Sequence, residues 1–382
     1  MTVGGASTTV GSGPADPFHT DGRYDLDALE GDLPAAVTAE LADYLAGRRM
    51  DVLDVAEEFA EATDDLTRFV LAGGKRLRPT FAWWGWRAAG GLDHAATVLR
   101  AVSALELIQG CALVHDDLID DSDTRRGEPT VHARWSSRHA GAAWAGDPTR
   151  FGAAVAILLG DVALAWADDM LHDAGLDRAA IARARPVWQA MRTEVLGGQF
   201  LDVAGHASSD SRPETALRIS RYKTAAYTIE RPLHLGAAIA GADDATVQAL
   251  RHYGRDLGIA FQLRDDLLGV FGDPAVTGKP AGDDLREGKL TLLVALTRRH
   301  PDRETAAVVE RTLGKPDLGT DDVAAAREAL KALGVVDDVE QRIAELTASA
   351  LDAVRGPDAP VLAPPAPERL ADLAVAATRR AR

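Results

Sequence analysis

Apolar and polar residues follow a helical period along most of this 382-residue chain. Apolar side chains recur three and four positions apart, as on one face of an α-helix, and no convincing run has the period of two that a strand requires. The predicted class is therefore all-α. The pattern predicts helices over residues 33–47, 51–72, 79–89, 93–121, 151–173, 178–204, 213–241 (with a bend near Pro232), 243–271, 290–299, 303–314, 320–333 and 336–355.

The patterning favours one helical domain with a tail at each end. Residues 1–25 are small and polar and are predicted to form a disordered N-terminal tail. The domain then covers residues 26–356, and residues 357–382 form a Pro-rich linker and a short C-terminal helix. Residues 153–167 are the most apolar stretch, but Asp161 interrupts them and they are too short to cross a bilayer. No stable membrane insertion is expected.

Charge and cysteine content limit the possible partners and the cellular compartment. The net charge of −16 argues against nucleic acid as a partner, because such binding needs clustered positive charge. Cys111 is the only cysteine, so no disulfide can form within the chain, which favours a reducing compartment. The first residues have neither a basic start nor an apolar core, so no signal peptide is visible. We expect a cytoplasmic protein.

Two aspartate clusters each end a long apolar run. The segment 115–121 reads His-Asp-Asp-Leu-Ile-Asp-Asp, and the segment 262–266 reads Gln-Leu-Arg-Asp-Asp. Residues four apart share a helix face, so Asp116 and Asp120 should point the same way, with Asp117 and Asp121 beside them. A single acidic cluster is most often a solvated helix face. Both of these, however, follow stretches that should be buried, which places their carboxylates at the rim of a cavity.

Carboxylates at this density need a cation. An all-oxygen ligand set suits Mg²⁺ and does not suit zinc. His115 is turned by about 100° from its neighbour, so we expect it in the core or behind the ligands. Gln199 and Asp202 are polar residues within an apolar helix, and buried polar groups need partners, of which a ligand is one candidate.

A basic loop adds a second anion-binding candidate. The segment 74–79 reads Gly-Lys-Arg-Leu-Arg-Pro and lies between two predicted helices. By itself it is equally well explained as cations at a helix C-terminus. Together with Arg125 and Arg126, it offers forked donors suited to a diphosphate held without metal.

The chain resembles the trans-isoprenyl diphosphate synthases over about residues 30–350. Five separated motifs occur in the family's order and spacing: residues 74–79, the cluster 116–120 followed by Arg125-Arg126-Gly127, Gly198-Gln199, Lys223-Thr224 and Asp265-Asp266. The resemblance implies an isoprenoid-synthase-type helical bundle around a central cavity. It also implies a homodimer that condenses isopentenyl diphosphate with an allylic diphosphate (dimethylallyl, geranyl or farnesyl), head to tail.

The same resemblance implies a role for each matching residue. Mg²⁺, as three ions with diphosphate bound, would be held by Asp116, Asp117, Asp120, Asp265 and Asp266, which are also the expected catalytic residues together with Lys223. The allylic diphosphate would also contact Arg125, Lys223, Thr224, Gln262 and Lys279. The isopentenyl diphosphate would contact Lys75, Arg78, Gln109 and Arg126.

Two positions depart from the family's pattern. Gln109 stands where many members have His, which keeps a hydrogen-bonding group. Gly269 stands where the second motif often has a third aspartate. Asp283 or Asp284, on the following loop, would have to supply the lost ligand.

The implied chemistry is ionisation followed by condensation, with the departing diphosphate as the base and no protein nucleophile.

A class I terpene cyclase is the first alternative, although it needs no second diphosphate pocket. A non-catalytic partner of another prenyl synthase is the second, although such a partner should have lost its metal ligands or basic loop.

The helix that precedes the first cluster should set the product length. Its N-terminal direction leads away from the metals, so Ala112, Cys111, Ile108, Leu105 and Ala104 should line the tunnel. In the family, bulky aromatics four or five positions before the first aspartate resemble a plug that stops growth at fifteen carbons. Cys111 and Ala112 are small, so we expect mainly geranylgeranyl diphosphate, with farnesyl or longer polyprenyl diphosphates as alternatives. Ile108 and Leu105, or Trp83, Trp84 and Trp86, are candidates for the floor.

Overall fold

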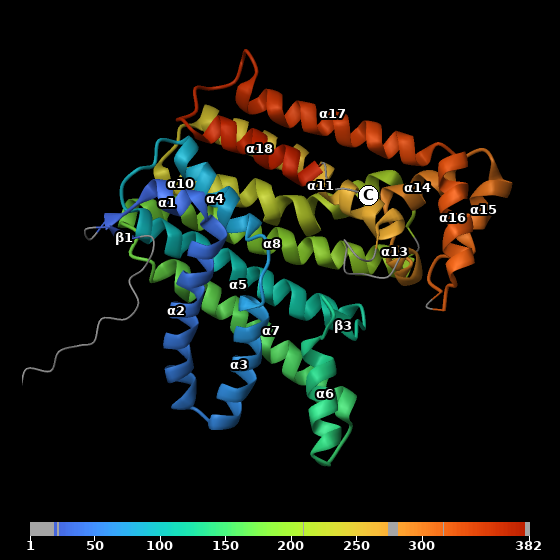
Figure 1. Ribbon diagram of the computed structural model, residues 1–382, viewed down its shortest axis with the longest axis horizontal. Coiled ribbons are helices and arrows are strands. Elements are labelled where there is room, and N and C mark those ends of the chain that lie inside the picture. The colour runs from blue at the N-terminus through green and yellow to red at the C-terminus, as the bar shows by residue number, and fades with distance from the viewer. Residues whose placement is uncertain (1–18, 21–22, 209, 274–281, 316, 379–382) are drawn as a thin grey trace, which may run out of the picture.

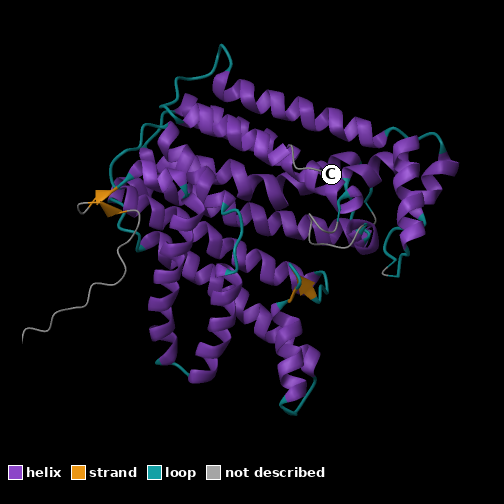
Figure 2. Cartoon of the chain, in the orientation of Figure 1, coloured by secondary structure: helices purple, strands orange, loops and turns teal. Residues whose placement is uncertain are grey.

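The computed structural model describes residues 19–20, 23–208, 210–273, 282–315 and 317–378. Most of these residues lie in helices, as Figure 2 shows, which confirms the predicted all-α class. The strands in this part of the chain are two residues long and form two antiparallel pairs. They are β1 (His19–Thr20) with β2 (Arg23–Tyr24), and β3 (Thr124–Arg125) with β4 (Glu128–Pro129).

The helices follow one another with short connections. The first half of the chain contains α1 (Leu26–Gly31), α2 (Leu33–Leu53), α3 (Glu57–Leu71), α4 (Leu77–Ala88), α5 (Ala95–Ile119), α6 (Val131–Gly141), α7 (Pro148–His172) and α8 (Arg178–Ser208). The second half contains α9 (Pro213–Ile219), η1 (Ser220–Glu230), α10 (Arg231–Ala240), α11 (Asp244–Phe271), α13 (Asp283–Glu287), α14 (Leu292–Arg299), α15 (Arg303–Glu310), α16 (Thr320–Ala332), α17 (Val335–Arg355) and α18 (Ala366–Thr378).

Most of these helices match the predicted segments, and the differences have local causes. The short helices α1 and α13, of six and five residues, offer too few positions for a period to be seen, and α6 is mostly polar. Residues 213–241 form α9, η1 and α10 instead of one helix bent near Pro232. The break comes earlier because η1 is a π-helix, whose extra residue per turn changes which side chains face the bundle.

The bundle is organised around α5, which is apolar on nearly every side and is therefore surrounded by other helices. It packs against α7, α4 and α2. In Figure 1, α17 and α18 lie along one side of the bundle on α11, while the α2–α3 pair and α6 project from the opposite side. Helices α13 to α16 gather at one end and bury a second apolar cluster against α11 and α17. This arrangement places the ends of α5 and α11, and thus both aspartate clusters, inside the bundle.

Two helices are long and apolar enough to cross a membrane by length and composition. They are α5 and α7, and 72% of the most apolar window of α5 but only 39% of that of α7 is buried inside the protein. Helix α7 extends beyond the apolar stretch 153–167 that the sequence singles out. Core helices of soluble proteins have the same length and composition, so two such helices are weak evidence for a membrane span.

Candidate active site

The first aspartate cluster lies at the C-terminal end of α5. Asp116 and Asp117 are on its last turn, but the helix ends at Ile119, so Asp120 caps it and Asp121 follows with a φ of 52°. The expectation that Asp121 lies beside Asp117 on one helix is therefore wrong, because the chain has already left the helix. Asp121 is exposed. Asp116, Asp117 and Asp120 form the patch.

Arg125 lies against this patch from the β3–β4 hairpin. Its Nε donates a hydrogen bond of 2.7 Å to Oδ1 of Asp117, whose side chain is almost wholly buried. Oδ2 of Asp117 is buried too, and among the described residues it has no hydrogen-bond partner. A buried carboxylate oxygen without a partner carries a desolvation cost that a bound cation would remove.

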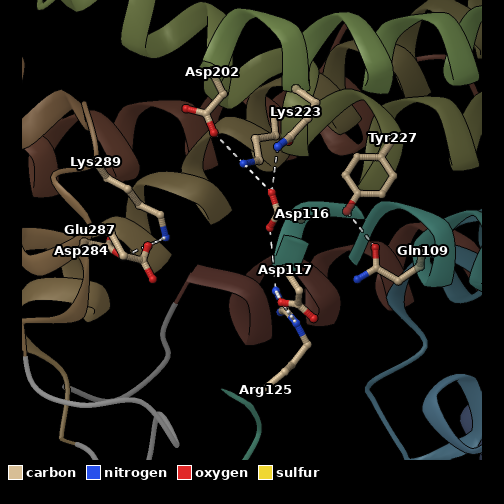
Figure 3. A network of polar contacts seen from close by, with 11 residues as sticks. Gln109, Asp116, Asp117, Arg125, Asp202, Lys223, Tyr227, Asp284, Glu287 and Lys289 are labelled. Carbon is tan, nitrogen blue, oxygen red and sulfur yellow. Dashed lines mark hydrogen bonds and ion pairs between the residues drawn. The ribbon is translucent and has the colours of Figure 1, made fainter. Parts of the chain in front are cut away.

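Asp116 links three elements (Figure 3). Its Oδ1 accepts bonds of 3.0 Å from Nε2 of Gln199 on α8 and of 3.0 Å from Nζ of Lys223 on η1. Lys223 also donates to Oδ2 of Asp202 at 2.5 Å. Gly198 makes this approach possible, since a Cβ there would lie 2.3 Å from the backbone nitrogen of Lys223. Gln199 and Asp202 thus have protein partners, Asp116 and Lys223, and not only a prospective ligand.

Charge at the first cluster is only partly balanced. Burial alone would lower the pKa of Lys223, but Asp116 and Asp202 raise it above its usual range, so Lys223 stays cationic. Burial would raise the pKa of Asp116, but Lys223 and Arg125 hold it below its usual range. Desolvation, and then Asp116, raises the pKa of Asp120 to about 6. Lys223 and Lys289 lower this pKa but do not cancel the rise, so a divalent cation would favour the ionised form of Asp120 further.

The second cluster lies near the C-terminal end of α11. Asp266 is buried, and its Oδ1 accepts a bond of 2.7 Å from Nε2 of Gln262, one turn earlier. Burial, and then the charge of Asp284, raises the pKa of Asp266 to about 8. Asp265 precedes it on the same helix. This site too has more negative charge than its own side chains neutralise.

Gly269 marks the place of the missing third aspartate, and the carboxylate of Asp284 fills it. A Cβ built on Gly269 would lie 2.0 Å from Oδ2 and 2.3 Å from Cγ of Asp284, which is in the first turn of α13. Of the two loop candidates, Asp284 is therefore the one at the second motif. It is buried, whereas Asp283 is only half-buried.

Lys289 was not among the predicted site residues. Its Nζ lies 3.1 Å from Oδ1 of Asp284 and 2.8 Å from Oε2 of Glu287, and Figure 3 shows these three side chains together. The charge of Lys289 lowers the pKa values of Asp120 and Asp266, but not enough to cancel the rise that burial causes. The sequence holds a signal for it, because Gly288-Lys289 ends an acidic loop directly after the second motif.

The basic loop 74–79 does not present all three cations to a ligand. Arg76 has a φ of 45° and points into the core, where its Nη1 lies 2.8 Å from Oε2 of Glu106 on α5. Both side chains are buried. Arg76 therefore holds the loop in place, whereas Lys75 is exposed and Arg78 is half-buried.

Arg78 and Gln109 belong to one chain of contacts. Nη2 of Arg78 donates to Oγ1 of Thr228 at 2.8 Å, and its guanidinium lies 4.1 Å from the ring centroid of Tyr227. The Tyr227 hydroxyl donates to Oε1 of Gln109 at 2.7 Å, which leaves the amide group of Gln109 to act as a donor. Tyr227 and Thr228 were not predicted, because it is the π-helix that turns them toward Arg78 of α4 and Gln109 of α5.

The remaining predicted residues are placed less completely. Arg126 donates from Nη1 to the carbonyl oxygen of Gly73 at 3.2 Å, so it lies beside the basic loop. Thr224 follows Lys223 on η1. Lys279 lies outside the described residues. Nε2 of His115 is 3.2 Å from the carbonyl oxygen of Ile157 on α7, and His115 lines the cavity below Asp116.

An apolar cavity of about 80 Å³ begins at the first cluster. Asp116, Gln199 and Lys223 are at its polar end, and Ile108, Cys111 and Ala112 line its α5 wall, as predicted. Leu164 of α7 and Arg192, Val195 and Leu196 of α8 also line it. Leu105, Trp83, Trp84 and Trp86 are not among its lining residues. They are buried in the main core, so their expected role as a floor has no support in this cavity.

The arrangement can bind two anions of different kinds. One anion would be held between the two aspartate clusters by cations that the carboxylates bind, beside Lys223 and Arg125. The other would lie near Lys75, Arg78, Gln109 and Arg126 without metal. The apolar cavity opens at the first position, so a ligand there can have a diphosphate head and a hydrocarbon tail.

Comparisons with known proteins agree with this geometry. Residues 59–330 match the family model described as polyprenyl synthetase. A geranylgeranyl diphosphate synthase of Mycobacterium tuberculosis is 36% identical over 295 residues, which is 75% of this chain and 77% of the relative. A (2E,6E)-farnesyl diphosphate synthase of Mycobacterium bovis is 37% identical over 264 residues, 68% of each chain. The crystal structure of a geranylgeranyl pyrophosphate synthase of Corynebacterium glutamicum, complexed with isoprenyl diphosphate and magnesium, has a TM-score of 0.87 and 47% identity. The match covers 92% of this chain and 99% of that one.

Proposed function

Since the chain belongs to the polyprenyl synthetase family and is a trans-isoprenyl diphosphate synthase, we propose that its main product is geranylgeranyl diphosphate. The enzyme joins an allylic diphosphate to isopentenyl diphosphate. The observation that carries the product assignment is the cavity below Asp116, where Cys111 and Ala112 leave the tunnel open.

Mg²⁺ is the proposed cofactor, bound as three ions when diphosphate is present. The donor set consists of carboxylate oxygens, the ligands that Mg²⁺ prefers. The buried unpartnered oxygen of Asp117 and the raised pKa values of Asp120 and Asp266 indicate that the site is built around an added positive charge. Asp116, Asp117 and Asp120 would hold it from α5, and Asp265 and Asp266 from α11. Asp284 takes the position left by Gly269.

The protein's own cations complete the binding of both substrates. Lys223 lies at the polar end of the cavity, and Arg125 lies beside Asp116 and Asp117. The allylic diphosphate would sit there, with Gln262, Thr224 and Lys279 as further predicted contacts. Lys75, Arg78, Gln109 and Arg126 would bind isopentenyl diphosphate. Tyr227 positions Arg78 and Gln109 by contacting both.

The reaction requires charge stabilisation more than a nucleophile. As the allylic carbon–oxygen bond breaks, negative charge grows on the leaving diphosphate, and Lys223 and Arg125 are fixed where they can stabilise it. Bound Mg²⁺ would supply further electrostatic stabilisation of the same charge. The double bond of isopentenyl diphosphate then attacks the allylic carbon, and the released diphosphate takes up the proton lost in the last step.

The relatives do not by themselves decide the product, since both farnesyl and geranylgeranyl diphosphate synthases are among them. Purified enzyme should therefore be incubated with dimethylallyl or farnesyl diphosphate, isopentenyl diphosphate and Mg²⁺, and the dephosphorylated products separated by chromatography. A dominant twenty-carbon alcohol is expected. A dominant fifteen-carbon alcohol from dimethylallyl diphosphate, or a dominant alcohol longer than twenty carbons, would refute the assignment. Consumption of geranylgeranyl diphosphate alone, with release of a cyclic hydrocarbon, would indicate the cyclase.

We also propose that the enzyme is a cytoplasmic homodimer. Large apolar side chains on α7 and α8 are exposed in the single chain: Ile157, Leu158, Leu196, Phe200 and Val203. Leu196 is 56% exposed and also lines the cavity, so a second copy on this surface would close the tunnel wall. Light scattering during gel filtration, for wild type and Phe200→Lys, tests this. A wild-type monomer would rule it out.

A further inference from the structure

We propose that Arg192, held by Asp168, forms a charged floor that ends chain growth in the product tunnel. This inference rests on the enzyme's elongation activity, and it assigns the stop to a side chain outside both aspartate clusters. Below its polar end the cavity is lined mostly by apolar side chains, with Tyr227 on η1, and Arg192 is the charged residue of its α8 wall.

The position of Arg192 follows from the way α5 and α8 run beside the cavity. The two helices are tied at the cavity's polar end, where Gln199 bonds to Asp116. Ile108 is eight residues before Asp116 and Arg192 is seven before Gln199, each about two helical turns back, or roughly 10–12 Å at 1.5 Å per residue. Both therefore mark the deep end of the same cavity, on opposing walls.

Helix α7 gives the same depth independently. It runs against α5, with Ile157 beside His115 at the level of the first cluster. Leu164, about two turns further along α7, lines the cavity, and Asp168 follows one turn later. Asp168 is thus beyond the deepest apolar residue of α7, where it meets Arg192.

The guanidinium is fixed at this place. Nη1 of Arg192 donates to Oδ2 of Asp168, and Nε1 of Trp188 donates to Oδ1 of Asp168 at 2.6 Å. Trp188 is fully buried and lies one turn before Arg192 on α8, so it anchors the carboxylate from below. The carboxylate has a partner on each oxygen, which holds the arginine in one orientation.

The family resemblance links a plug four or five positions before Asp116 to a fifteen-carbon product, and Arg192 lies about one helical turn deeper, roughly 5 Å, so a growing chain would meet this charge about one five-carbon unit later. One such unit adds four carbon–carbon bonds of about 1.5 Å, or roughly 5 Å in an extended chain. To grow further, the hydrocarbon would have to displace the guanidinium or cover a charged group with apolar surface, which is costly. Further condensation therefore becomes unfavourable when the tail reaches Arg192.

The test is the product length of Arg192→Ala and Arg192→Met. The side chains of Arg192 and Asp168 are 26% and 34% exposed, so the pair is not part of the sealed core and both variants should fold. Arg192→Ala removes charge and volume, while Arg192→Met keeps an unbranched chain without charge. In both, the main product should lengthen by at least one five-carbon unit.

Arg183→Ala is the matched control, because Arg183 lies on the same helix and bonds to the carbonyl oxygens of Ala238 and Ile239, away from the cavity. Its product length should equal that of wild type even if its melting temperature falls. If Arg192→Ala does not yield soluble protein, Arg192→Met alone decides. An unchanged product in the soluble, active Arg192 variants would overturn the floor. The wild-type product is read separately, so a wrong product assignment would not be mistaken for a wrong floor.

Discussion

Moving the carboxylate from position 284 to position 269 tests whether Asp284 replaces the third aspartate of the second motif. Gly269→Asp alone should be harmful, because its Cβ would lie 2.0 Å from Oδ2 of Asp284. Ordinary contacts are near 3.5 Å, so the carboxylate of Asp284 would have to move by roughly 1 Å or more, and two like charges would then share one place.

Asp284→Ala should be harmful for a different reason, since it removes the carboxylate itself. The loss of one charge-assisted interaction costs roughly 1.5–3 kcal/mol, which is about 10- to 150-fold in affinity. It also removes one of the two carboxylates beside Lys289, whose Nζ is still 2.8 Å from Glu287. The double variant Gly269→Asp with Asp284→Ala returns a carboxylate to the same space without the clash. It should recover most of the loss, with a coupling energy of at least about 1 kcal/mol.

The assay is calorimetric titration of inorganic pyrophosphate into each variant with Mg²⁺ present, beside turnover with both substrates. Circular dichroism verifies that each variant is folded. Asp283→Ala, one residue away and only half-buried, is the matched control and should bind pyrophosphate as wild type does. If the losses of the two single variants simply add in the double variant, Asp284 does not occupy the functional position of the third aspartate.

Other substitutions address the remaining parts of the site. Asp116→Ala should lower kcat on the order of 10²-fold or more, because it removes both a proposed metal ligand and the partner of Lys223; activity within a few-fold of wild type would contradict this. Arg78→Ala should raise the KM for isopentenyl diphosphate and spare that for the allylic substrate, so separate titrations showing the reverse would mean that the pockets are exchanged. Cys111→Phe should fill the cavity and shift the product toward farnesyl diphosphate, as chromatography of the dephosphorylated alcohols would reveal, and an unchanged product would exclude this helix face. Burial, with Arg231 and Arg251 nearby, lowers the pKa of His234 to about 4. As pH falls from about 6.5 to 4, His234 is therefore protonated in the unfolded chain before it is protonated in the folded one, which destabilises the folded state. The melting temperature of wild type should drop more steeply over this range than that of His234→Gln.

The sequence by itself determined the helical class and the position of both aspartate clusters. Apolar spacing along residues 95–119 and 244–271 is a local property, and the apolar faces of both helices have to be buried, which brings the aspartates at their C-terminal ends to the bundle. Roles for Lys223 and Arg125 at the metal-bound diphosphate were predicted from motifs. The tunnel wall of Ile108, Cys111 and Ala112 follows from helical spacing before Asp116.

Only the tertiary structure decided which groups meet across the bundle. Nothing local indicates that Arg76 turns into the core toward Glu106, thirty residues away, while Arg78 stays with Tyr227. Residues 213–241 carry an ordinary helical pattern, yet close packing makes the middle of the segment a π-helix.

The same holds where the chain departs from its family's motif and where its tunnel ends. Gly269 is a missing ligand in the sequence, and only packing brings Asp284 into the space that its absent side chain leaves. In the sequence, Arg192 and Asp168 look like two separate surface charges. In the folded chain they form one ion pair at the end of the cavity. Periodicity constrains each helix on its own, whereas these contacts depend on how closely two backbones approach, and that distance is set by the packing of every helix around them.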